Sequence, residues 1–193
     1  MESETPSEIM DATGRALCEY GYADLTMKRI ADEASMTAAA IHYHFDTKDE
    51  LLTAFLEHLI EGFESQLTCE RADPRERLDA FLDAVFSSSK SGDDFPIALM
   101  ELKAQAPYHE GFRDRFLELD ETVRGVVASI VRDGIDAGHF EEVDPEDVAR
   151  VVATLINGSH VRNVALGEDR EETRTIIEGY LANRLGWTPG VVA

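Results

Sequence analysis

Lysine is the residue type that this sequence most lacks. Only four of the 18 basic residues are lysines, Lys28, Lys48, Lys90 and Lys103, against 39 acidic residues and a formal net charge of −21. Such acidity argues against the basic surface by which most nucleic-acid-binding domains are recognised. A surface rich in carboxylates and poor in lysine favours a protein that stays soluble in concentrated salt, as in a halophile's cytoplasm. An ordinary acidic bacterial protein is the alternative.

Cysteines and long apolar runs are also scarce. Cys18 and Cys69 are the only cysteines, and two cysteines in a chain of intracellular type are more often reduced than bridged. No apolar run reaches 18 residues and no signal peptide is visible, so we expect a cytoplasmic protein without membrane contact. No P-loop, GxSxG or strand-linked GxGxxG motif is present. We therefore expect no enzymatic activity and no cofactor.

Apolar residues recur at helical spacing along most of the chain, and no alternating strand pattern rises above noise. The predicted fold class is all-α with about nine helices: an N-terminal helix-turn-helix head of three short helices and a larger helical body. Gly21, Gly138 and Gly167 are expected to end helices, and Pro74 and Pro145 to open them. The predicted helices cover about 6–20, 26–34, 37–44, 47–67, 74–86, 95–106, 110–137 and 145–166, with a loop at 87–92. The last begins at Asp169 or Glu171 and runs to Leu185.

Residues 26–48 predict two short helices joined by a tight turn. Thr26 and Thr37 are suited to cap them, because a threonine hydroxyl accepts a hydrogen bond from a free N–H of the first turn. Ile30 and Ile41 are the apolar anchors, and Ala31 is small enough for the two helices to cross closely. This window holds three basic and three acidic residues. It is locally neutral inside a strongly acidic chain.

At these residues the chain resembles the TetR family of transcriptional regulators. The resemblance rests on Ile30-Ala31, the segment from Ala34 to Thr37, the segment from Ile41 to Phe45, and the segment from Thr47 to Leu51. It covers about the first 60 residues. Three positions depart from the usual pattern: Ser35 stands where the family has its turn glycine, Ala39 replaces a common glycine, and His42 replaces a common tyrosine.

The resemblance implies a DNA-binding domain at residues 1–50 and an effector-binding and dimerisation domain at residues 51–193. It implies a homodimer that binds a palindromic double-stranded DNA operator, usually as a repressor, and is released by a small-molecule effector. A recognition helix presents its first half to base edges, while hydroxyls and cations near helix starts meet phosphates. The residues expected to contact DNA are Thr26, Lys28, Thr37, Ala38, Ala39, Ala40, His42, Tyr43, His44 and Lys48.

Two histidines in this window also raise the question of a metal site. His42 and His44 are two residues apart and so face different sides of a helix. No cysteine or carboxylate cluster completes a ligand set beside them. We expect no metal; His44 either meets DNA or buttresses the turn.

The last two predicted helices carry a broad apolar arc that suits a four-helix dimer interface. The expected interface residues are Val151, Val152, Leu155, Ile156, Ser159, Ile176, Ile177, Tyr180 and Leu181. The aromatic-rich helices that precede them are expected to enclose an apolar cavity for an apolar or cationic effector, with an acyl chain as the main alternative. Candidate effector contacts are Phe63, Phe81, Val85, Met100, Phe116 and Asn157. A filled core explains the same apolar pattern, and an interface hydrogen bond explains Asn157.

Two other functions fit parts of the pattern. The helical body could bind a lipid or acyl group, or act as an enzyme, with no DNA role. The chain could also be a structural dimer whose head has lost DNA binding. The effector, the operator sequence and the regulated genes are not encoded in any motif of this chain.

Overall fold

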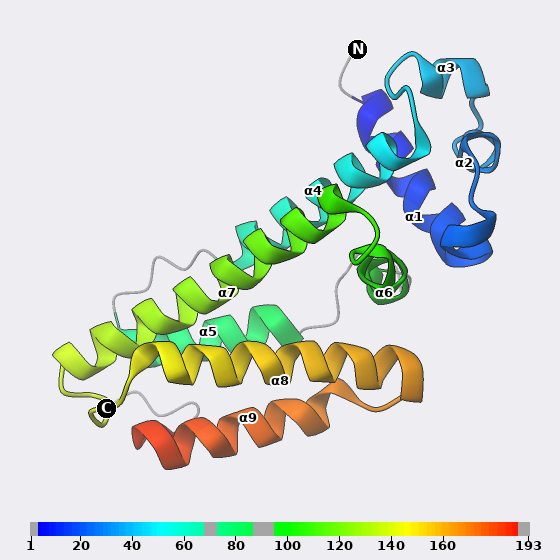
Figure 1. Ribbon diagram of the computed structural model, residues 1–193. Helices are drawn as coiled ribbons and strands as arrows, with labels where there is room; N and C mark the ends of the chain where they lie inside the picture. Colours follow the sequence, from blue (N-terminus) through cyan, green and yellow to red (C-terminus); the bar gives the residue numbers. More distant parts are fainter. Residues whose placement is uncertain (1–3, 68–72, 87–94, 189–193) are drawn as a thin grey trace. The chain divides into compact units, whose positions relative to one another are not determined.

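The computed structural model describes residues 4–67, 73–86 and 95–188, and over these residues the fold is all-α (Figure 1). The described residues form nine helices and no strand, which confirms the predicted fold class. The helices are α1 (Glu4–Asp24), α2 (Met27–Glu33), α3 (Ala38–His42), α4 (Lys48–Leu67), α5 (Pro74–Phe86), α6 (Phe95–Gln105), α7 (Glu110–Asp136), α8 (Pro145–Leu166) and α9 (Arg170–Leu185). The loop expected at 87–92 lies outside the described residues.

Capping residues explain why the helices begin and end where they do. Asp144 and Asp169 accept hydrogen bonds from first-turn N–H groups of α8 and α9, as N-cap aspartates do. Gly167 and Gly186 follow the two helices in the left-handed conformation, with φ of 69° and 68°. That conformation is free of strain only for glycine. The ends predicted for α8 and α9 are confirmed.

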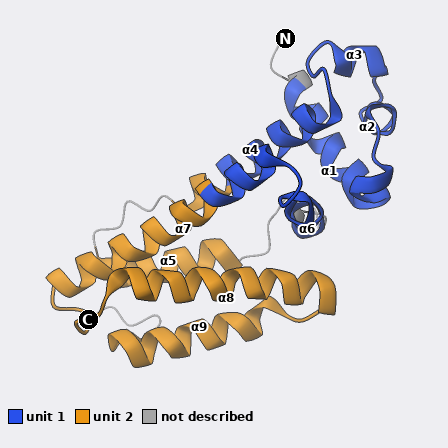
Figure 2. Cartoon of the chain, in the orientation of Figure 1, with its two compact units in different colours: residues 1–62, 89–117 blue, residues 63–88, 118–193 orange. Residues whose placement is uncertain are grey.

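The chain forms two compact units (Figure 2). Unit 1 comprises residues 1–62 and 89–117, and unit 2 comprises residues 63–88 and 118–193. Both boundaries fall inside helices, in α4 and in α7. Unit 1 therefore holds more than the predicted head, because α6 and the beginning of α7 belong to it.

Unit 1 is built around α1, which packs against α2 and α6. One face of α1 belongs to the core, since Ile9, Ala16 and Leu17 are fully buried. The backbone leaves the helical conformation at Gly21, with φ 68° and ψ 165°, and one further turn follows up to Asp24. Gly21 thus interrupts α1 as predicted, but it does not end the helical segment.

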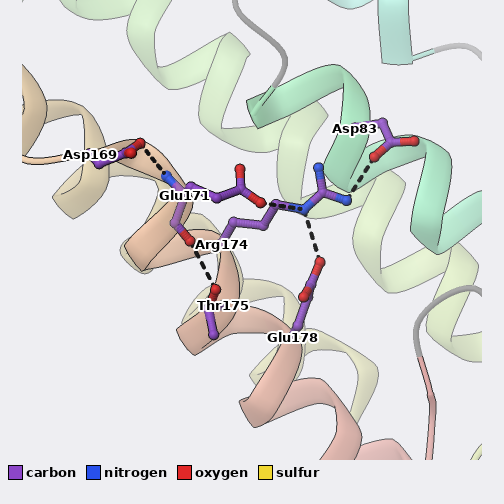
Figure 3. Close-up of polar contacts among 6 residues, drawn as sticks. All are labelled: Asp83, Asp169, Glu171, Arg174, Thr175 and Glu178. Atoms are coloured by element: carbon purple, nitrogen blue, oxygen red, sulfur yellow. Dashed lines mark hydrogen bonds and ion pairs between the residues drawn. The ribbon is translucent and has the colours of Figure 1, made fainter.

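Unit 2 has a continuous apolar core to which α5, α7, α8 and α9 contribute, closed by the indole of Trp187. Arg174 of α9 interacts with three carboxylates beside this core (Figure 3). Its guanidinium donates to Asp83 of α5 at 2.7 Å and to Glu178 at 2.9 Å, and Glu171 lies 3.8 Å away. The hydrogen bond with Glu178 raises the pKa of Arg174. Asp83 and Arg174 lie on helices that are far apart in the sequence. Their hydrogen bond therefore links α9 to α5, which also pack against each other.

None of the helices within the described ranges combines the length and the low charge needed to cross a bilayer.

The turn between α2 and α3 is made without a glycine. Ser35 takes up a left-handed conformation, with φ 53°, as the only described residue other than glycine with positive φ. The turn is held by the N–H of Met36, which donates to the carbonyl of Ala31 at 2.9 Å. A side chain in this conformation costs about 1 kcal/mol. Serine thus takes up at this turn a conformation that glycine adopts without strain.

Replacing Ser35 by glycine should therefore stabilise the protein. Removal of the strain exceeds the extra entropy that glycine adds to the unfolded chain, so the free energy of unfolding should rise by about 0.5–1 kcal/mol in urea titrations. Ser65→Gly is the matched control, because Ser65 is exposed inside α4. Glycine there should lower stability by about 0.5 kcal/mol. A loss of stability in both variants would contradict the strained turn.

Candidate nucleic-acid interface

Two threonine caps position the helix pair at residues 27–42. The Thr26 hydroxyl oxygen accepts a hydrogen bond from the Arg29 N–H at 3.2 Å, and the Thr37 oxygen accepts one from the Ala40 N–H at 3.2 Å. Ile30, Ala31 and Ile41 are buried and hold the two helices onto the rest of unit 1. The predicted helix-turn-helix is thus confirmed, with Thr37 as cap and Ala38–His42 as the second helix.

One face of α3 is turned to solvent. Ile41 is completely buried and Ala38 is half-buried, whereas Ala39, Ala40 and His42 are exposed. Tyr43, which follows the helix, is 85% exposed. At about 100° per residue, Ala39 and Tyr43 lie near the centre of the face opposite Ile41. This face offers two methyl groups, a phenol and an imidazole, and no cation.

Most cations of the head are held by the protein itself. Arg15 donates to the carbonyl of Glu33 at 3.1 Å and lies 3.5 Å from that residue's carboxylate. Arg29 donates to the carbonyl of Asp24, and its guanidinium lies over the ring of Tyr20. Lys28 is exposed and has no recorded partner in the described part of the chain. Lys28 is therefore the head cation best placed to meet a phosphate.

Lys48 is engaged in a different way from the one its sequence position suggests. Its ammonium donates to the carbonyl of Tyr22 at 3.1 Å and lies 4.3 Å from the centre of the Tyr22 ring. An ammonium held by a carbonyl and an aromatic face is already partly desolvated. A phosphate contact by Lys48 would have to compete with these two interactions, so it stays a prediction that the geometry does not favour.

Tyr22 connects three segments of unit 1. Its hydroxyl is 2.7 Å from Nε2 of His109, before α7, and 3.4 Å from the carboxylate of Asp49 in the first turn of α4. Its backbone N–H donates to Glu101 of α6 at 2.9 Å. Burial and the nearby Asp49 charge raise the pKa of Tyr22, so the phenol stays protonated at neutral pH. The sequence analysis missed these contacts, since residues 22 and 109 are separated by most of unit 1 and share no local pattern.

His44 is exposed and its ring packs edge-on against Tyr43, 5.1 Å between centroids. This arrangement fits a buttress for Tyr43 as well as a DNA contact. Over the described ranges, no three side chains of histidine, cysteine, aspartate or glutamate gather as metal ligands would.

The residues expected at the dimer interface separate into two groups. Val151 and Ile176 are exposed, at 37% and 60%, and Leu155, Ile156 and Tyr180 are half-buried. Val152, Ser159, Ile177 and Leu181 are buried, at 4% exposure or less. Val152, Ile177 and Leu181 belong to the core of unit 2, and Ser159 is also buried. Burial within the chain does not favour contact of these four side chains with a partner.

The residues expected to bind an effector do not gather in one unit. Phe81 and Val85 are buried in the core of unit 2, and Phe63 packs against that core. Asn157 is on the exposed side of α8, where its amide donates to the carbonyl of Ala153 at 3.2 Å. Met100 and Phe116 belong to unit 1, and the Lys103 ammonium lies 5.2 Å from the Phe116 ring centroid. A filled core accounts for Phe81 and Val85.

Comparisons with known proteins agree with this geometry. Residues 9–55 match the model of bacterial regulatory proteins of the tetR family, and residues 74–186 match the BetI-type transcriptional repressor C-terminal domain. The HTH-type transcriptional regulator BetI of Brucella anthropi is 27% identical over 195 residues, covering 96% of this chain and 95% of that protein.

Solved structures share the fold. A TetR transcription regulator from Haloarcula marismortui is 43% identical, with a TM-score of 0.88, over 95% of this chain and 99% of that one. A transcriptional regulator from Saccharomonospora viridis, solved in complex with choline, has a TM-score of 0.85 at 21% identity, over 95% of this chain and 98% of that one. Because a family model covers residues 74–186, more than half of the sequence, and a second covers the helix-turn-helix, this chain belongs to the TetR family of transcriptional regulators, with a C-terminal domain of BetI type.

Proposed function

We propose that this regulator represses transcription as a homodimer that binds a palindromic operator through α2 and α3 and dissociates when a small cation binds the body. The observation that carries the DNA-binding part is the exposed face of α3, which lies on a capped helix pair anchored by Ile30 and Ile41. In helix-turn-helix proteins the second helix enters the major groove, and dimers bind half-sites about one helical turn apart.

The charge distribution of the head supports DNA binding whose affinity falls only slowly as the salt concentration rises. Arg15, Arg29 and Lys48 are engaged within the head, and Lys28 is an exposed cation without a partner among the described residues. Each phosphate neutralised by a cation contributes about −0.9 to the slope of log affinity against log salt. The exposed carboxylates of Asp32 and Asp46 repel phosphate at low salt, and that repulsion is screened as salt rises. Binding should therefore depend largely on hydroxyls and apolar contacts.

We expect the operator affinity to fall only slowly between 0.2 and 3 M KCl, with a slope near −2 for the two Lys28 residues of a dimer. The operator is first selected from a random DNA pool, and affinity is then measured by fluorescence anisotropy. Lys28→Ala should flatten the slope by about 0.9 per subunit, whereas Lys103→Ala, which removes a lysine outside the helix pair, should leave it unchanged. A slope steeper than about −5 in the unmodified protein would reject this account.

The dimer surface that we propose lies on the exposed sides of α8 and α9. Val151, Leu166 and Ile176 are large apolar side chains with exposures of 37%, 68% and 60%. The half-buried Leu155 and Tyr180 extend this surface along the two helices. Exposed apolar patches of this kind mark interaction sites in soluble proteins, and two copies of an antiparallel helix pair can form a four-helix bundle.

Ile176→Glu should convert the dimer to monomers, because the carboxylate would be desolvated without a partner at the centre of the interface. Sedimentation velocity at micromolar concentration measures the change. Thr175→Glu is the matched control: it adds the same charge at an exposed position about 100° around α9 and should leave the dimer intact. An unmodified protein that is already monomeric would refute this assignment.

A cationic effector is favoured by charge and by one relative. The chain has a net charge of −21, which raises the local concentration of cations. The structure from Saccharomonospora viridis contains choline, a quaternary ammonium compound. Aromatic side chains bind such groups through cation–π contacts, and Phe63 is a partly exposed aromatic residue of unit 2.

Choline at about 100 times its dissociation constant should stabilise the protein by about 2.7 kcal/mol and raise its melting temperature by about 5–10 °C. Differential scanning fluorimetry measures the shift, and choline should also release the operator. Ethanolamine, which lacks the three N-methyl groups, is the control and should have little effect. A shift with a long-chain acyl-CoA but none with choline would instead support the acyl alternative.

A further inference from the structure

The exposed face of α3 also indicates how the operator is read. We infer that Ala39 and Ala40 recognise the 5-methyl groups of thymines in the major groove, so that sequence is read mainly by apolar contact rather than by hydrogen bonds from this helix. The inference rests on the proposed DNA binding and specifies its chemistry. Both alanines are exposed, while their neighbour Ile41 is completely buried and fixes which side of the helix faces outward.

The composition of α3 leaves few other ways to read bases. Arginine, lysine, asparagine and glutamine make the specific bidentate contacts to base edges in the major groove. None of them occurs from Thr37 to Phe45. The Thr37 oxygen already accepts the Ala40 N–H. Ala39 and Tyr43 lie near the centre of the exposed face, with Ala40 on one side of it and His42 on the other. Within the helix itself, the groups on the Ala40 side and at the centre are the methyl groups of Ala39 and Ala40.

Thymine is the base that matches such a surface. Its 5-methyl group is the only apolar substituent that an unmodified base pair presents in the major groove, and alanine is among the residues that contact it. The short alanine side chain also lets the helix backbone approach the base edges closely. The resulting contact removes apolar surface from water, is worth about 0.8 kcal/mol per methyl group, and is not screened by salt. It therefore agrees with a head in which only Lys28 is an exposed cation without a recorded partner in the described residues.

Replacing thymine by uracil tests the inference, since the two bases differ only in the 5-methyl group. The operator selected from a random pool is synthesised with one thymine at a time replaced by deoxyuridine at the equivalent position of both half-sites. At a contacted position the affinity should fall about fourfold per methyl group, or about sixteenfold for the symmetric pair. At thymines outside the α3 footprint it should not change.

A double-mutant cycle assigns the contact to a residue. In Ala39→Gly or Ala40→Gly the loss caused by uracil at the contacted position should disappear, because the protein methyl group is already absent. Ala38→Gly is the control: this residue is half-buried beside Ile41, so the uracil effect should persist. Each comparison uses one protein on two DNAs, which cancels any effect of glycine on the folding of α3. The uracil effect should also be equal in 0.2 and 2 M KCl.

The outcomes distinguish a failure of the methyl readout from a failure of the proposed DNA binding. Specific operator binding with no loss at any uracil position would overturn the methyl readout and leave the proposed DNA binding standing. A uracil effect that persists in both glycine variants would overturn the assignment to Ala39 and Ala40. If no sequence is enriched from the random pool, operator binding fails, and the methyl readout fails with it.

Discussion

The position of α2 and α3 depends on how the end of α1 is held in unit 1. Gly21 leaves the helical conformation, and the backbone N–H of Tyr22, the next residue, donates to Glu101 of α6. The Tyr22 ring then lies beneath the Lys48 ammonium, and its hydroxyl contacts His109 and Asp49. One tyrosine thereby fixes the start of α4 and the α6–α7 turn to the helix that supports α2. A movement of α6 or of the beginning of α7 within unit 1 would be transmitted to α1 through these contacts.

Local signals in the sequence were sufficient to predict the helices. They were not sufficient to predict contacts between residues far apart in the chain. Thr26, Thr37, Asp144 and Gly167 act within a few residues of their own position, so their capping roles could be predicted from the sequence alone. The role of Lys48 could not, because its partner Tyr22 lies 26 residues earlier in the chain. A lysine at a helix start looks the same in sequence whether it meets phosphate or a carbonyl of its own protein.

The proposed dimer surface shows the same limit in another form. Val151 and Val152 are neighbours of one type, as are Ile176 and Ile177, yet in each pair one residue is exposed and the other is buried. Helical spacing identifies an apolar arc, but it does not show how much of that arc the chain covers with its own helices. In unit 2 that coverage comes from the packing of α5, α7, α8 and α9 in one apolar core, and the hydrogen bond from Arg174 to Asp83 joins α9 to α5 (Figure 3).

In this acidic chain the cationic side chains mainly stabilise the fold, and this bears on the DNA binding that we propose. Lysine is rare, and arginine supplies 14 of the 18 basic residues. The planar guanidinium makes directional bonds to carboxylates and carbonyls, which a strongly hydrated ammonium does less well. Arg75 with Asp73, Arg77 with Asp133, and Arg174 with its three carboxylates are examples in unit 2. Arg15 and Arg29 serve the head in the same manner. Cations that hold the fold together in this way are not free to neutralise phosphates. The DNA-binding surface proposed above therefore offers methyl groups, hydroxyls and, among the described lysines of the head, the exposed Lys28, and we expect contacts of that kind to weaken little as the salt concentration rises.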